Sequence, residues 1–170
     1  MPIPNFEIRL YGDPCLRMKS TLIKAVGPSE RVLIEALMAA MYEHKGVGLA
    51  APQVGINQQI FVADVGQGPV VVVNPKIIKK FGSGYYEEGC LSIPGIIVNI
   101  KRSEKVIVKY LDENNQPVER QYSDLMARVF QHETDHLYGK LILDYASWYE
   151  KMKLKKQLQE IVSLSQKTTS

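Results

Sequence analysis

The feature that most constrains this chain is the run His132-Glu133-Thr134-Asp135-His136, in which two histidines stand four residues apart. On an α-helix, residues four apart lie on the same face, so both imidazoles can bind one metal ion. Glu133 then projects beside that ion toward a bound water. The alternative is a pair of helix histidines that only pack or face solvent. The run favours a metal-dependent hydrolase, which places one helix at the centre of the site.

The residues around this run predict a helix over about 124–138. Leu125 and Val129 continue its apolar face, residue 123 or 124 suits the N-cap, and Gly139 suits the end of the helix. Two further helices are predicted from apolar residues at helical spacing, over 29–45 and 147–165.

The middle of the chain has a different residue pattern, with short runs of strand-forming residues separated by Gly, Pro and Asn clusters. Strands are predicted over 60–63, 70–73, 97–101, 105–111 and 118–122, with a hairpin turn over 112–115. The predicted fold class is α+β, with antiparallel sheets packed around a central metal-binding helix that carries the HExxH run. An N-terminal helix and a C-terminal helix complete it.

Length and composition exclude several classes of protein. The 170 residues contain no repeat, low-complexity segment or long linker, so we expect one catalytic domain over 1–170. A net charge of +3 is too small for a protein coated in basic residues. The longest uncharged run, over 46–63, contains a proline and several amides, so no membrane-spanning helix is expected. Two cysteines supply no disulfide framework, which leaves either thiol available for chemistry.

A catalytic metal ion usually has three protein ligands and an open position for water, so a third ligand is needed. Cys90 is the candidate, within the segment Glu88-Gly89-Cys90-Leu91-Ser92, where a glycine permits a tight backbone. An isolated cysteine is otherwise a small buried hydrophobe. We assign that second interpretation to Cys15, whose one neighbouring ligand type is Asp13.

A third segment, over 46–53, lies just past the first predicted helix. Its small residues would let a substrate backbone approach closely, and Gln53 carries an amide that can donate a hydrogen bond. By itself the segment is equally typical of a helix C-cap followed by a packed loop.

Together the three segments resemble the peptide deformylases, whose motifs are GxGLAAPQ, EGCLS and QHExDHL. They stand here in the same order over 46–53, 88–92 and 131–137, with every fixed position present. The resemblance also includes residues 11–17 and Arg102, so it covers the chain to about Tyr145.

The resemblance implies removal of the formyl group from the N-terminal formylmethionine of new polypeptides, with release of formate. It implies that Cys90, His132 and His136 hold one divalent ion, natively Fe²⁺, with Zn²⁺, Ni²⁺ or Co²⁺ forms obtainable. Such a ligand set suits several first-row metals. Glu133 would take a proton from the attacking water and pass it to the leaving amine. The Gln53 side chain and the Leu91 backbone N–H would stabilise the oxyanion.

Further residues are expected to support this chemistry. Glu88 needs a partner because an unpaired buried carboxylate is costly, and Arg102 is the candidate. Arg128 is expected to flank the pocket for the methionine side chain rather than to line it. The walls of that pocket are expected to come from Val47, Gly48, Gly89, Leu125 and Val129.

Two other functions remain open at this point. A zinc peptidase of the HExxH type would take a downstream His or Glu as its third ligand, whereas the remaining histidine, His44, lies upstream. A ribosome-associated metal-binding module without catalysis would need neither Glu133 nor Gln53.

The partner expected from the resemblance is an N-formylmethionyl nascent peptide, with neither a membrane nor DNA. Four lysines over 151–156 could hold the last helix near ribosomal RNA, or they could simply be solvated. The N-terminus lacks the apolar core of a signal peptide. We therefore expect a bacterial cytoplasmic protein, with an organelle as the alternative.

Overall fold

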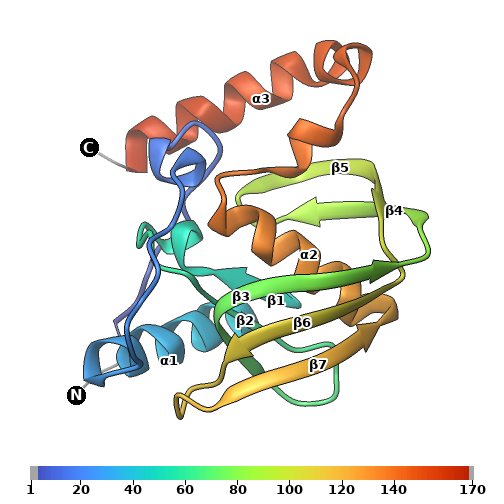
Figure 1. The fold of residues 1–170 in the computed structure, drawn as a ribbon. Coiled ribbons are helices and arrows are strands. Elements are labelled where there is room, and N and C mark those ends of the chain that lie inside the picture. Colours follow the sequence, from blue (N-terminus) through green and yellow to red (C-terminus); the bar gives the residue numbers. More distant parts are fainter. Residues whose placement is uncertain (1–3, 169–170) are drawn as a thin grey trace.

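The fold places one helix between two antiparallel sheets (Figure 1). The structure is a computed structural model that describes residues 4–168. Within that range the helices are α1 (Pro28–Glu43), α2 (Asp124–Leu137) and α3 (Trp148–Thr168). The predicted α+β class, with antiparallel sheets around a central helix, is confirmed. Within the same residues, no helix is both long and apolar enough to cross a membrane.

The larger sheet has five strands in the order β1-β2-β3-β6-β7. They are β1 (Gly48–Ala50), β2 (Ile60–Ala63), β3 (Val70–Phe81), β6 (Lys105–Leu111) and β7 (Pro117–Ser123). The smaller sheet is a hairpin of β4 (Gly84–Cys90) and β5 (Ile93–Arg102). Three short 3₁₀ helices are η1 (Pro14–Arg17), η2 (Ala51–Val54) and η3 (Ile142–Tyr145).

The predicted strand bounds match the structure for two strands and are too short for others. The bounds of β2 and β6 match the prediction, whereas β3 and β5 extend well beyond it. Two strands, β1 and β4, were not predicted. Each contains glycine, and β4 also carries two glutamates, so their strand propensity is low and tertiary pairing decides their conformation.

The first helix ends two residues before its predicted end at residue 45. The N–H of Lys45 donates to the carbonyl of Tyr42, and the N–H of Gly46 donates to that of Met41. This is the Schellman pattern, which places Lys45 in the left-handed region with φ 55°. The chain therefore turns sharply at Lys45 and enters β1.

The apolar side of α2 fixes the helix on the five-stranded sheet. The Phe130 ring packs edge-on against Phe61, with ring centroids 5.1 Å apart, and stacks against Tyr122 at 5.7 Å. Phe130 and Phe61 are fully buried, so each contributes roughly 1.5–3 kcal/mol of hydrophobic stabilisation. This packing turns the opposite side of α2, with His132 and His136, toward the β4–β5 hairpin (Figure 1).

The segment before η1 connects the loop after β1 to the turn after β4. The N–H of Arg9 donates to the carbonyl of Gln53 at 2.7 Å, and that of Tyr11 donates to the carbonyl of Ser92 at 2.8 Å. On its other side, the segment contacts α3 through the Ser165 hydroxyl, which donates to the Leu10 carbonyl. The predicted range for α3, 147–165, starts one residue early and stops three residues short.

Candidate metal centre

Three side chains that can ligate a metal meet where the end of β4 faces α2. The Sγ of Cys90 lies 3.3 Å from Nε2 of His136, which lies 3.2 Å from Nε2 of His132. One ligand atom from each of the three lies within 4.8 Å of the other two. Three electron-pair donors that converge in this way fit a divalent ion, and three protein ligands leave a position open for water.

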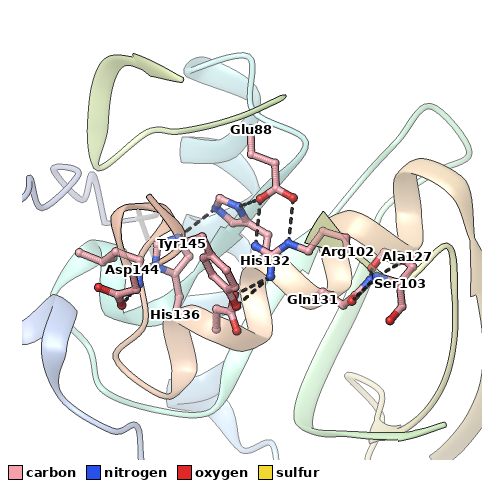
Figure 2. A network of polar contacts seen from close by, with 11 residues as sticks. Glu88, Arg102, Ser103, Ala127, Gln131, His132, His136, Asp144 and Tyr145 are labelled. Atoms are coloured by element: carbon pink, nitrogen blue, oxygen red, sulfur yellow. Dashed lines mark hydrogen bonds and ion pairs between the residues drawn. The ribbon is translucent and has the colours of Figure 1, made fainter. Parts of the chain in front are cut away.

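A buried network orients one of these imidazoles (Figure 2). Nδ1 of His132 faces Glu88 Oε2 at 3.0 Å, so its Nε2 is directed toward the other two ligand atoms. Arg102 donates to both oxygens of Glu88, at 2.8 and 2.9 Å. Burial raises the pKa of Glu88, but the hydrogen bonds from Arg102 and His132 outweigh it and lower that pKa to about 2. Glu88 is therefore a carboxylate, which accepts the Nδ1 proton.

The guanidinium of Arg102 has two further partners, one near the C-terminal end of α2 and one at the end of η3. It donates to Asp135 Oδ2 at 2.7 Å and to the Tyr145 hydroxyl oxygen at 3.2 Å. The Tyr145 hydroxyl itself donates to Asp135 Oδ2 at 2.6 Å. The buried cation therefore faces two carboxylates and a phenol.

Glu133 lines the same cavity as Cys90 and His132, and its carboxyl lies against Gly48 of β1. It is 4% exposed, and its Oε2 has no hydrogen-bond partner among the described residues. Burial raises the pKa of Glu133 to about 7. A Cβ at Gly48 would lie 2.5 Å from Oε1 of Glu133, so a larger residue here would displace the carboxyl. A buried, unpartnered carboxyl of this kind is suited to exchange a proton with a reacting group.

The amide of Gln53 is held in one orientation. Its Oε1 accepts the backbone N–H of Ala50 at 2.9 Å, so Nε2 points the other way. That nitrogen donates to Ser92 Oγ at 3.2 Å and contacts Cys90 Sγ at 3.5 Å. Gln53 thus presents an N–H to the metal centre.

These groups open onto a cavity of about 570 Å³. Its lining includes the five residues predicted for the methionine pocket together with Gln53 and Leu91. Arg128, expected only to flank the pocket, also lines the cavity, because its guanidinium is held over the Tyr86 ring of β4. Val129 is buried, whereas Val47 and Leu125 are exposed at the rim. Sequence reasoning did not single out His44, Lys45, Glu87, Pro94 and Gly95, which also line the cavity.

Cys15 stands apart from this centre, in η1. Its Sγ donates to the Pro52 carbonyl at 3.4 Å, and burial together with the hydrogen bond to Asp13 raises its pKa to about 12. A neutral thiol is a poor metal ligand.

Sequence reasoning missed three contacts around the centre. Ser92 belongs to a motif that had been singled out, but its contact with Gln53 depends on the turn after β4. Tyr86 and Tyr145 lie outside the motifs, and no pattern in the sequence links them to Arg128 and Arg102.

The fold and the centre together define a metal-dependent hydrolase: a helix carries two of the candidate ligands and a buried carboxyl, and a neighbouring hairpin carries the third candidate. The family model for polypeptide deformylase matches residues 5–152. The chain belongs to the polypeptide deformylase family.

Individual relatives agree with this assignment. The chain is 45% identical over 157 residues to the peptide deformylase of Thermotoga maritima, with 92% of this chain and 96% of that protein covered. It is similar to the crystal structure of a peptide deformylase from Legionella pneumophila, with a TM-score of 0.89 and 36% identity over 95% of this chain and 97% of that one. The crystal structure of the Thermotoga maritima enzyme gives a TM-score of 0.81 at 47% identity, covering 84% of this chain and 97% of that one.

Proposed function

We propose a residue-level mechanism for removal of the formyl group from the N-terminal formylmethionine of nascent polypeptides. The products are formate and a free α-amine. Removal of the N-formyl group is the activity of the family to which the chain belongs. The observation that carries the mechanism is the buried Glu133 carboxyl, which has an unpartnered oxygen and lines the same cavity as Cys90 and His132.

In this proposal Cys90, His132 and His136 hold one divalent ion. When bound, the ion supplies Lewis acidity, which lowers the pKa of the attacking water. We propose Fe²⁺ as the native ion, with Zn²⁺, Ni²⁺ and Co²⁺ as other forms, since a set of one thiolate and two imidazoles suits them all. Metal analysis of protein purified without oxygen tests this choice. Peroxide should also inactivate the iron form faster than the nickel form, and equal rates would remove iron from the proposal.

Glu133 moves the proton. Its carboxylate accepts a proton from the attacking water as the water adds to the formyl carbon, and the resulting acid gives that proton to the leaving nitrogen. The raised pKa of Glu133 suits both halves of this exchange, because its acid and base forms are both accessible near neutral pH.

Two N–H groups stabilise the negative charge that develops on the formyl oxygen. We assign them to Nε2 of Gln53 and the backbone nitrogen of Leu91, because both residues line the cavity. The Ala50 N–H holds the Gln53 carbonyl oxygen and so keeps Nε2 directed at the site. A donor that is already aimed needs little reorganisation during the reaction.

The methionine side chain enters the cavity beside α2. The small and apolar residues Val47, Gly48, Gly89, Leu125 and Val129 form its walls in this proposal. Glycine at 48 and 89 lets the peptide backbone lie close to the protein backbone.

A formate-release assay on a formyl-Met peptide tests the function, with internal cleavage of an unformylated peptide measured in parallel. We expect release of formate and no internal cleavage. Internal cleavage would favour a zinc peptidase, and metal binding without either reaction would favour a non-catalytic module. Membership of the deformylase family disfavours both alternatives.

We also propose that the basic side of α3 contacts the ribosome, where formylated chains appear. Lys151, Lys153, Lys155 and Lys156 are all exposed. Changing the four to Gln should abolish salt-sensitive co-sedimentation with ribosomes and leave activity on free peptides unchanged. Four other exposed lysines, at 76, 79, 80 and 105, provide a control with the same change of charge. Undiminished co-sedimentation would mean that the α3 lysines are only solvated. For location we propose the bacterial cytoplasm, which the bacterial relatives support, with an organelle as the alternative.

A further inference from the structure

We infer that Tyr145 is a positioning residue for the metal ligand His132, acting through Arg102 and Glu88. Tyr145 belongs to η3, outside the three motifs, and its hydroxyl is hydrogen-bonded to Arg102 and Asp135. The inference rests on the proposed ligand set of Cys90, His132 and His136.

The first part of the contact network connects the Tyr145 hydroxyl to the Arg102 guanidinium. The hydroxyl donates its one proton to Asp135 Oδ2 and accepts from Nη1 of Arg102, which also donates to that Oδ2. These three groups form a closed ring of hydrogen bonds, so the phenol fixes the rotation of the guanidinium about its long axis (Figure 2).

The second part of the network connects the Arg102 guanidinium to the His132 imidazole through Glu88. With Nη1 held, Nε and Nη2 of Arg102 meet the two oxygens of Glu88 side by side. Glu88 Oε2 then faces Nδ1 of His132 at 3.0 Å. A carboxylate held in this way sets both the tautomer and the ring plane of a metal-binding histidine.

The ring of Tyr145 has a second effect, because it covers the guanidinium. The Cζ of Arg102 lies 4.8 Å from the centroid of the Tyr145 ring. The Arg102 side chain is 4% exposed, whereas Tyr145 as a whole is 37% exposed. Tyr145 therefore stands between solvent and the buried charge pair, and the exclusion of water strengthens that pair.

Tyr145→Phe is the decisive variant, since it removes the hydroxyl and keeps the ring. We expect the dissociation constant for Zn²⁺, measured by competition with a chromophoric chelator, to rise about three- to tenfold. This is less than the roughly 10- to 100-fold typical of a direct partner of a metal ligand. Tyr138→Phe is the matched control. Tyr138 is an exposed tyrosine like Tyr145, but its ring lies against Lys19 and not against Arg102.

The melting temperature of the metal-free protein is measured for both variants. A purely structural role for Tyr145 would lower that temperature and leave the dissociation constant within twofold of the unmodified protein, and this result would overturn the inference.

A double-mutant cycle tests the route. In a Glu88→Gln background, Tyr145→Phe should cause no further weakening of Zn²⁺ binding, because its effect passes through Glu88. The same weakening in both backgrounds would show that Tyr145 does not act through Glu88. Cys90→Ser tests the ligand set separately, so an unchanged Zn²⁺ affinity in that variant would identify the ligand set as the failed premise.

Discussion

The guanidinium of Arg128 lies over the ring of Tyr86, with Cζ 4.2 Å from the ring centroid. This pair is the first of three that link α2 to β4. Residues four apart on the helix face residues two apart on the strand, in the pairs Arg128 with Tyr86, His132 with Glu88 and His136 with Cys90. The metal centre is therefore one end of a regular helix–strand contact, and the cavity wall is the other.

Replacing Arg128 by Ala should enlarge the cavity at that wall. We expect KM for a formyl-Met peptide to rise by a few-fold, equivalent to about 1 kcal/mol, while kcat and metal content stay close to those of the unmodified protein. Arg120→Ala is the control, because Arg120 lies over the Tyr122 ring and does not line the cavity. A loss of metal in Arg128→Ala would show that the cavity wall and the metal centre do not act independently.

Replacing Glu133 by Gln should leave the metal bound and lower kcat by more than about 10²-fold, because the amide cannot accept the proton of the attacking water. Formate release and metal content are measured on the same sample. Near-normal turnover would contradict the assignment of proton transfer to Glu133.

The two cysteines should differ in their effect on metal content. Cys90→Ser should weaken or alter metal binding, because Cys90 Sγ lies among the converging ligand atoms. Cys15→Ser should do little, since Cys15 contacts the Pro52 carbonyl instead. The reverse pattern in metal analysis would mean that Cys15 is the ligand and Cys90 is not.

Lys45→Gly should stabilise the protein. Lys45 occupies the left-handed position that ends α1, which costs a residue with a Cβ about 1 kcal/mol. We expect the melting temperature to rise by about 2–4 °C. Lys45→Ala removes the same charge but keeps the Cβ, so it should bring no gain. An equal rise in both variants would indicate relief of charge repulsion instead.

Asp144 should make stability depend on pH in the acid range. Burial raises the pKa of Asp144, but the hydrogen bonds from Arg17 and the Leu141 N–H outweigh it, so that pKa is lowered. A lowered pKa in the folded state gives stability that is complete above the unfolded pKa of about 3.9. This stability is lost as the pH falls through the folded value.

Asp144→Asn should therefore lower the free energy of unfolding at pH 7 by about 0.5–1 kcal/mol, since the pair is partly exposed. The difference from the unmodified protein should shrink below about pH 4. Urea titrations across this range measure it. Glu119→Gln, in a more exposed pair with Lys109, is the control and should have no more than a slight effect. A deficit independent of pH would argue against an ionic cause.

The helices and the most apolar strands could be predicted because their patterns are local. The predicted bounds of β2 and β6 match the structure, and α2 ends one residue before its predicted end. By contrast, β4 owes its conformation to pairing with β5, where Glu88 stands opposite Val98. No short-range pattern in a segment with two glycines and two glutamates indicates that pairing.

The structure brings the candidate site residues together, but several contacts among them were beyond sequence reasoning. Spacing on one helix was enough to place His132 and His136 side by side. The contact between Gln53 and Ser92 depends on a turn 39 residues further along the chain. The position of Tyr145 over Arg102 depends on how η3 folds back on β5. Contacts of this kind follow from tertiary packing alone.

The hydrogen bonds from Arg9 and Tyr11 to the two segments that carry Gln53 and Ser92 have a consequence for folding. They close loops that span much of the chain, and such closures are slow because they cost entropy before contacts repay it. We therefore expect these two hydrogen bonds to form late in folding. A chain lacking its first dozen residues would lose them and keep Cys90, His132 and His136, the three candidate metal ligands. We expect such a truncated protein to bind metal normally but to release formate slowly.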